Sequence, residues 1–215
     1  MLLKPNDIAA RFALALVVVV VLLLSTSAIA DGDVWWQMAY GKYFLDNGTL
    51  IPDHSIYTWT EASSAYIYCA WIAEIALYWI YEFMGLKGLF GLRYFAMLLP
   101  IILVLWLGKK YKSPPSALVW FVFSICYLMS YASGGLIKPE LFSFMFMALL
   151  TTNYFAIKAG GFGAWKLSYV FPALILLWAN THGGFIIGML FLATASAGEA
   201  LNYFLRSQNA LETKT

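Results

Sequence analysis

Six long apolar runs constrain the fold of this chain more than any other feature of its sequence. A helix needs roughly 17–25 mostly apolar residues to cross a bilayer. Hydrophobic residues make up 62% of the chain and charged residues only 11%, whereas soluble domains average about 25% charged residues. The sequence therefore predicts an all-α, polytopic integral membrane protein. The predicted spans cover residues 12–30, 95–107 (extended back toward 88), 117–132, 141–157, 167–179 and 185–205.

The first apolar run has a second interpretation, because Ala28, Ile29 and Ala30 resemble a signal-peptidase cleavage site. We expect the run to be retained as the first span. The connections between the later runs are rich in glycine, proline or charge, as is typical of loops. They read GKKYKSPP, SGGLIKPE, KAGGFGAWK and NTHGG.

Residues 66–85 are apolar and aromatic but contain Glu74 and Glu82, so they form either a seventh span or a helix in the membrane interface. The positive-inside rule favours the interfacial helix. In that topology nine of the 13 basic residues are cytoplasmic, and those outside are Lys42, Lys87, Arg93 and Lys138. We therefore expect six spans, one or two interfacial helices in the first extracytoplasmic loop, and both termini in the cytoplasm. The membrane would be the inner or plasma membrane of the cell.

This topology predicts a single module over residues 1–206, with an extracytoplasmic loop at 31–94 and a cytoplasmic tail at 207–215. It places eight of the 11 acidic residues on the extracytoplasmic side. Acidic caps of independent helices have no reason to share one side of the membrane. The distribution therefore indicates a site that is built from several loops.

Asp31 and Asp33 directly follow the first span, and two interpretations remain open for them. In the simpler one they are a polar stop at the membrane surface. In the other, the helical spacing of apolar positions over residues 35–45 predicts a short amphipathic helix that holds Asp33 at headgroup depth. A carboxylate held there can bind a divalent cation or take a proton from a hydroxyl group.

Lys138, Pro139 and Glu140 stand at the start of the predicted fourth span. Proline and glutamate are both favourable in the first turn of a helix, so capping alone explains this motif. In the functional alternative, Lys138 holds a phosphate, and Glu140 is its polar partner or a metal ligand.

Three further features are candidates. Asn180 and His182 lie in an NTHGG turn, where glycines let the backbone approach a ligand, although the histidine could simply bond to neighbouring backbone. Glu74 is costly at membrane depth unless it faces water or a partner, so it is a candidate functional residue. Arg93 is a weaker candidate, because a cation that reaches toward the membrane boundary is the simpler explanation.

Other classes of function receive no support. The net charge is +2 and the basic residues are scattered, so no nucleic-acid partner is predicted. No GxGxxG, P-loop, HExxH or CxxC pattern occurs. The two cysteines, Cys69 and Cys126, are interpreted as buried thiols. A small transporter is disfavoured, because no span carries a charge near its centre and no repeat of short broken helices is visible.

The order of motifs along the chain resembles that of a known superfamily. A first span that ends in acids precedes DxWWxxxxGxxxxxxG, which is followed by IPDHSIYTWT, AWIAEIALYWIYEFMG, KPELFSF and LWANTHGGFIIG. Over roughly residues 8–205, this order resembles the GT-C membrane glycosyltransferases, which include protein O-mannosyltransferases, aminoarabinose transferases and oligosaccharyltransferases. The resemblance implies that a polyprenyl-phosphate-linked sugar is bound on the extracytoplasmic face and transferred, with inversion, to an acceptor.

The resemblance also implies roles for individual residues. Asp33, with Asp31 as the alternate, would occupy the catalytic acid position. Asp33, Glu74 and Glu140 would be candidate ligands of a divalent metal ion. The lipid phosphate would be bound by Lys138, Arg93, His182 and Asn180. The implied partners are membrane lipid, the polyprenyl-phosphate sugar and other membrane protein subunits; the alternative is a shortened, non-catalytic module that serves as an accessory or scaffold subunit of a larger membrane complex.

Overall fold

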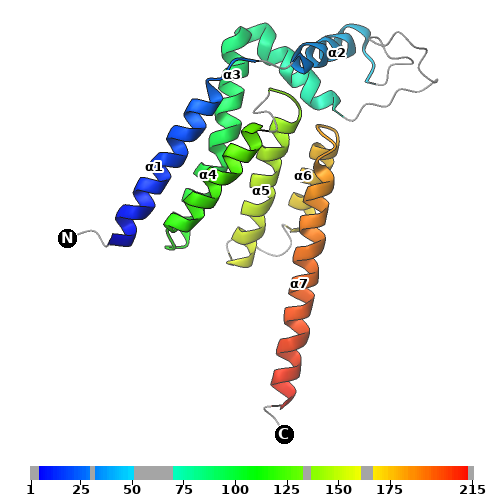
Figure 1. The fold of residues 1–215 in the computed structure, drawn as a ribbon. Helices are drawn as coiled ribbons and strands as arrows, with labels where there is room; N and C mark the ends of the chain where they lie inside the picture. The colour runs from blue at the N-terminus through cyan, green and yellow to red at the C-terminus, as the bar shows by residue number, and fades with distance from the viewer. Residues whose placement is uncertain (1–4, 30–31, 51–69, 133–136, 161–166, 213–215) are drawn as a thin grey trace.

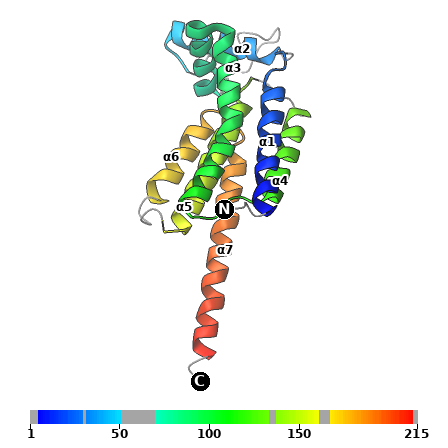
Figure 2. The ribbon, with the colours of Figure 1, turned by 90° about the vertical axis from the view of Figure 1, so that its left-hand side faces the viewer.

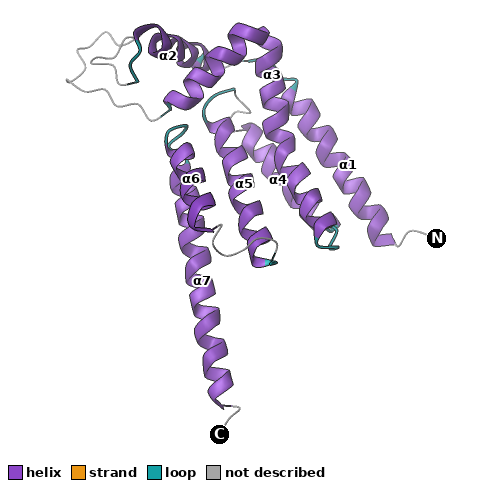
Figure 3. Cartoon of the chain, turned by 180° about the vertical axis from the view of Figure 1, so that it is seen from behind, coloured by secondary structure: helices purple, strands orange, loops and turns teal. Residues whose placement is uncertain are grey.

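The computed structural model describes residues 5–29, 32–50, 70–132, 137–160 and 167–212. Every regular element in these ranges is an α-helix, which confirms the predicted all-α class (Figure 3). The helices are α1 (Pro5–Ser25), α2 (Asp33–Asn47), α3 (Trp71–Lys110), α4 (Ala117–Ala132), α5 (Glu140–Lys158), α6 (Leu167–Ala179) and α7 (Phe185–Glu212).

Helices α1, α4, α5, α6 and α7 run side by side with the second part of α3, while α2 and the first part of α3 lie across one end of this bundle (Figure 1). We call these two segments the crossing layer. A view turned by 90° shows the same layer and shows that α7 extends well beyond the other helices (Figure 2). The first turn of α1 and the last turn of α7 both lie away from the crossing layer. This is the arrangement expected of helices in the membrane interface above a set of spans.

α3 is a bent helix of 40 residues, and its bend lies at Gly85. Gly85 has φ +58° and ψ −152°, a conformation that is essentially restricted to glycine. Gly88 is also constrained, because a Cβ there would lie 2.5 Å from the Cβ of Met84. The predicted interfacial segment and the predicted second span are therefore two helical segments that meet without a loop, and the chain changes direction between them at Gly85.

The described helices support a membrane protein but do not confirm the number of spans. Four stretches are long and apolar enough to cross a membrane: Asp7–Ser25, Trp71–Lys110, Glu140–Lys158 and Phe185–Arg206. The apolar helices Ala117–Met129 and Tyr169–Ala179 are shorter. A helix of 13 residues, such as α6, is about 20 Å long, against about 30 Å for the hydrocarbon core of a bilayer. Six spans therefore stay a prediction.

Three apolar clusters hold the helices together. One joins α1, α3 and α4 around Trp120, and another joins α5, α6 and α7 around Trp178. The third contains Val34, Leu77 and Ile137, and it joins α2, the first part of α3 and the residue stretch before α5. Val34 follows Asp33 and Ile137 precedes Lys138 in the sequence. The third cluster therefore positions these two charged residues, which are described below.

The crossing layer is closely packed where α2 meets α3. Gly41 of α2 lies directly against the backbone of Glu74, so that a Cβ at Gly41 would be only 2.2 Å from the Glu74 carbonyl oxygen. Glycine at this position therefore allows the two helix backbones to approach each other.

Candidate functional site

Four polar side chains from three separate parts of the chain meet beneath the crossing layer. Asp33 begins α2, Lys138 and Glu140 stand at the start of α5, and His182 lies in the turn between α6 and α7. Lys138 Nζ is 3.8 Å from Asp33 Oδ2 and 4.0 Å from Glu140 Oε1. Glu140 Oε1 is in turn 3.7 Å from His182 Nε2. We call these four residues the polar cluster; only the fold brings Asp33, the Lys138–Glu140 pair and His182 together, because these three parts are far apart in the sequence.

Lys138 is the centre of the polar cluster. Its side chain is 19% exposed, against 46% for Asp33 and 47% for Glu140. The residues beside the two opposed charges, Ile137 and Val34, are both buried in the third apolar cluster. Apolar packing therefore holds the backbone on both sides of the ion pair, while the side chains of Asp33 and Glu140 are each about half exposed, although Glu140 Oε2 itself is buried.

Asp33 is oriented by its own helix. It is the first residue of α2, where a negative charge interacts favourably with the helix dipole. Trp36 Nε1 donates a hydrogen bond of 3.0 Å to Asp33 Oδ1, so that Oδ2 is the oxygen that faces Lys138. The neighbouring Trp35 is half-exposed and packs edge-on against Tyr81 of α3. Trp36 therefore orients the carboxylate of Asp33, whereas Trp35 packs within the crossing layer.

His182 is held by hydrogen bonds on the side of the ring away from Glu140. Ser143 Oγ, from α5, lies 2.7 Å from His182 Nδ1, and the backbone N–H of Gly184 donates to the same nitrogen at 3.1 Å. Trp178 Nε1 donates to Ser143 Oγ at 2.7 Å. A Cβ at Gly184 would lie 2.8 Å from both His182 Nδ1 and Ser143 Oγ, so a side chain there would disturb this arrangement.

The turn that carries His182 lies outside the helices that are long enough to cross a membrane. Partial burial lowers the pKa of His182 below its ordinary value of 6.5. The carboxylate of Glu140 raises this pKa and the ammonium group of Lys138 lowers it, each by less than burial does. His182 is therefore a neutral hydrogen-bonding group at pH 7.

Two of the predicted phosphate ligands join separate elements of the fold. Asn180 Oδ1 accepts a hydrogen bond of 3.0 Å from Trp71 Nε1, which ties the turn between α6 and α7 to the start of α3. Arg93 is buried, and its Nη1 donates to the backbone carbonyls of Ser25 and Ser27 at 3.2 and 2.7 Å. A cation suits this position, because the C-terminal end of α1 carries the negative end of the helix dipole.

Glu74 lies in the crossing part of α3, before the bend, and is fully buried. Among the described residues, neither of its carboxylate oxygens has a hydrogen-bond partner. Burial raises the pKa of Glu74 from 4.5 to about 8. The carboxyl group is therefore largely neutral at pH 7, which makes it a poor ligand for a cation.

The predicted metal ligands do not gather in one place. In the part of the chain that the structure describes, no three His, Cys, Asp or Glu side chains lie close enough to hold a metal ion, and Asp33, Glu74 and Glu140 all belong to that part. A divalent metal ion stays a prediction from the resemblance alone. Asp31, the alternate catalytic residue, lies outside the described residues.

The sequence patterns did not single out Ser143, Trp178 or Trp36 as site residues. Ser143 is three residues after Glu140 in α5, and Trp178 is four residues before His182. Residues three or four positions apart lie on one face of a helix, so a search for hydrogen-bonding residues one turn away from KPE and NTHGG would have found the first two.

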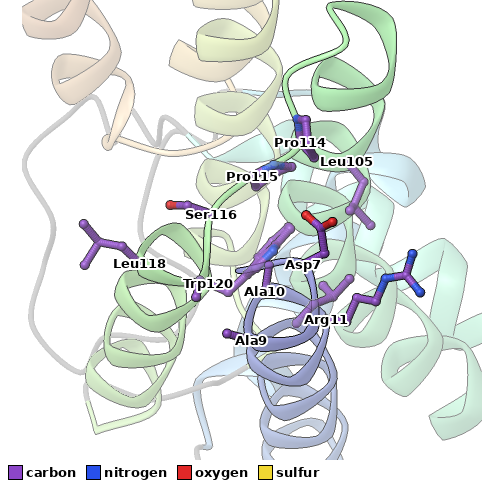
Figure 4. A pocket seen from close by; sticks show the side chains of 12 residues that line it. Asp7, Ala9, Ala10, Arg11, Leu105, Pro114, Pro115, Ser116, Leu118 and Trp120 are labelled. Carbon is purple, nitrogen blue, oxygen red and sulfur yellow. The ribbon is translucent and has the colours of Figure 1, made fainter. Parts of the chain in front are cut away.

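A separate pocket of about 670 Å³ opens at the other end of α1 from the polar cluster (Figure 4). Asp7 and Arg11 of α1 line one side, and Pro114, Ser116 and Trp120, from the α3–α4 connection and α4, line another. Because it lies at the opposite end of the bundle, this pocket does not contribute to the candidate site.

Comparison of the chain with protein-family models, with curated proteins and with solved structures found no match. The GT-C resemblance therefore stays a prediction from the order of motifs. The polar cluster is the observation from which a function can be argued.

Proposed function

We propose that the chain is a membrane glycosyltransferase-like protein, which binds a polyprenyl-phosphate-linked sugar on the extracytoplasmic face and transfers the sugar to an acceptor. The observation that carries this proposal is the polar cluster, in which a lysine and a neutral histidine lie within 4.0 Å of half-exposed carboxylates. Such a set of groups can hold a phosphate and accept a proton within one site. The order of motifs that resembles the GT-C superfamily supports the same reaction.

In the proposed reaction, Asp33 is the base. The acceptor hydroxyl gives its proton to Asp33 as its oxygen attacks the anomeric carbon of the sugar. The bond between this carbon and the phosphate oxygen breaks, and its electron pair leaves with the polyprenyl phosphate. Lys138 and His182 stabilise the negative charge on that phosphate by ionic and hydrogen bonding. Attack and departure take place on opposite faces of the carbon, so its configuration inverts.

The place of the polar cluster in the fold supports a lipid-linked donor. It lies where α5 begins and where the turn enters α7, and both helices contain stretches long enough to cross a membrane. A phosphate at headgroup depth would reach the cluster beneath α2 while its prenyl chain stays among the lipid tails. By the positive-inside rule we place this end outside the cytoplasm of a cell membrane, with six spans and cytoplasmic termini.

Sugar transfer by the purified protein in lipid nanodiscs tests this proposal. Labelled polyprenyl-phosphate glucose, mannose and aminoarabinose serve as donors, and release of sugar to added bacterial envelope extract or to water is measured. Asp33→Asn should lower the rate by about 100-fold or more, because the variant lacks the base. Asp46→Asn is the matched control, because Asp46 is another α2 carboxylate in an ion pair, 2.8 Å from Lys42. Equal rates for the wild type and Asp33→Asn, or no release from any donor, would contradict the proposal.

The surface of α7 favours a second candidate function, that of an accessory or scaffold subunit. Of residues 185–206 only Gly188 is buried, and Ile187, Leu190 and Phe204 are among the exposed side chains. α7 also extends beyond the rest of the bundle (Figure 2). A different membrane protein that covers α7 in a purified native complex, together with an absence of transfer by the isolated chain, would favour this function over catalysis.

A further inference from the structure

The hydrogen bonds around His182 determine which of its ring nitrogens carries the proton. An indole N–H can only donate, and that of Trp178 donates to Ser143 Oγ at 2.7 Å. The hydroxyl proton of Ser143 is then free to point at His182 Nδ1, which is 2.7 Å away. The backbone N–H of Gly184 also donates to Nδ1, at 3.1 Å. Nδ1 is therefore an acceptor, and the neutral ring carries its proton on Nε2.

Trp178, the first residue in this chain of hydrogen bonds, is held in place by the side chains packed around it. Trp178 is 1% exposed, and its ring stacks on that of Phe146 with 5.8 Å between the centroids and 16° between the planes. Gly188 of α7 lies so close that a Cβ there would be 2.5 Å from the indole ring. The direction of the Trp178 N–H bond is thus set by the packing of α5, α6 and α7.

The other end of the chain faces the polar cluster. His182 Nε2 lies 3.7 Å from Glu140 Oε1, which is too long for a hydrogen bond. Lys138 Nζ lies 4.0 Å from the same oxygen and 3.8 Å from Asp33 Oδ2. The Nε2–H group and the ammonium group therefore both approach Glu140 Oε1 without a short bond to it, and an anion that binds at this point would meet the Nε2–H group.

We propose that Trp178 and Ser143 are positioning residues, which hold His182 as a neutral donor through Nε2, and that this donor binds an oxygen of the lipid phosphate. We call Trp178, Ser143 and His182 the histidine relay. The identity of the ligand rests on the proposed function, whereas the tautomer does not. In the opposite tautomer, a lone pair on Nε2 would face the phosphate oxygen and repel it. The relay thus makes the site selective for an anion without adding a second positive charge.

Nitrogen NMR of the protein in detergent micelles reads the tautomer directly and requires no lipid donor. His54→Gln removes the other histidine, so that every labelled ring signal comes from His182. At pH 8 we expect a protonated Nε2 and an unprotonated Nδ1. Ser143→Ala leaves Nδ1 with the longer bond from the Gly184 N–H, so it should raise the fraction of rings protonated on Nδ1. Ser143→Thr, which keeps the hydroxyl, should restore the wild-type signals. The matched control is Ser124→Ala, because the hydroxyl of this buried serine donates to Trp120 O within α4.

Affinity for farnesyl phosphate, with farnesol as the uncharged control, tests the role of the relay in binding. Ser143→Ala should weaken binding of farnesyl phosphate by about tenfold, because a directed hydrogen bond to an anion is lost for part of the time. Binding of farnesol should not change. A proton on Nδ1 in the wild type, or an unchanged tautomer in Ser143→Ala, would overturn the relay. The expected tautomer without any binding of farnesyl phosphate would overturn the phosphate role and the proposed function, while the relay itself would stand.

Discussion

Burial keeps two titratable residues of this chain neutral near pH 7, with different consequences. His182 is partly buried and has a lowered pKa, so it offers the polar cluster a hydrogen bond in place of a positive charge. Glu74 is fully buried, and its oxygens have no hydrogen-bond partner within the described ranges. Because the pKa of Glu74 is about 8, its carboxyl group is mostly protonated at pH 7, and the folded protein avoids most of the cost of a buried charge.

Replacement of Glu74 by glutamine is expected to change stability in a pH-dependent way. The pKa of Glu74 is about 8 in the folded state against 4.5 as the ordinary value, so the folded state binds more protons between these values. The stability that the neutral carboxyl group contributes is therefore complete below pH 4.5 and is lost as the pH rises through 8. Glu74→Gln should stabilise the protein by on the order of 3 kcal/mol at pH 8 and by much less at pH 5.

Denaturant unfolding in detergent at both pH values measures this difference. Glu82→Gln is the control, because Glu82 lies on the same part of α3 but is exposed. An effect of Glu74→Gln that is equal at pH 5 and pH 8 would show that Glu74 ionises normally in the folded protein.

At the scale of the elements, glycines set the direction of α3 and its distance from α2. Hydropathy could not decide whether residues 66–85 cross the membrane or lie in its interface, since both kinds of helix are apolar and aromatic. In the structure, the first part of α3 lies across the end of the bundle, as expected of an interfacial helix, and it meets the second part directly at a kink at Gly85 (Figure 1). A backbone bend depends on a single φ/ψ pair, which is why a pattern averaged over a whole segment did not predict it.

Gly85→Ala is expected to destabilise the protein by roughly 1–3 kcal/mol, because an alanine is strained at φ +58° and ψ −152°. The matched control is Gly91→Ala in the same helix, where a Cβ meets nothing within 4 Å and φ is not positive. The control should be neutral or slightly stabilising, since alanine is the better helix former. Thermal unfolding in detergent compares the two variants, and equal losses of stability would mean that the bend needs no glycine.

Across the whole molecule, the fold gathers polar residues that the predicted topology had placed on one side of the membrane. The positive-inside rule put Asp33, Lys138 and His182 on one face, and the structure brings these three together with Glu140. The rule assigns a side to each loop but gives no distance between loops. It could therefore not separate Glu74, which is buried in the first part of α3, from the carboxylates that do meet Lys138.

The contacts of the histidine relay could not be predicted from the sequence for a related reason, although helical spacing places Ser143 and Trp178 about one turn from Glu140 and His182. Ser143 reaches His182 and Trp178 only because α5 packs against the end of α6, and such packing depends on the shapes of many side chains. A serine and a tryptophan inside apolar runs look like ordinary parts of a membrane helix. Polar residues at the ends of spans were the stronger signal, since charge there is costly without a partner or water.

A polar cluster that binds a lipid phosphate should give the purified protein a measurable equilibrium affinity for farnesyl phosphate. Lys138→Gln should weaken this binding by about tenfold or more, because it removes the charge at the centre of the cluster. Lys42→Gln, which breaks the exposed Lys42–Asp46 ion pair on α2, should bind as tightly as the wild type. Equal affinity of the wild type and Lys138→Gln for farnesyl phosphate would show that the polar cluster does not bind the lipid phosphate.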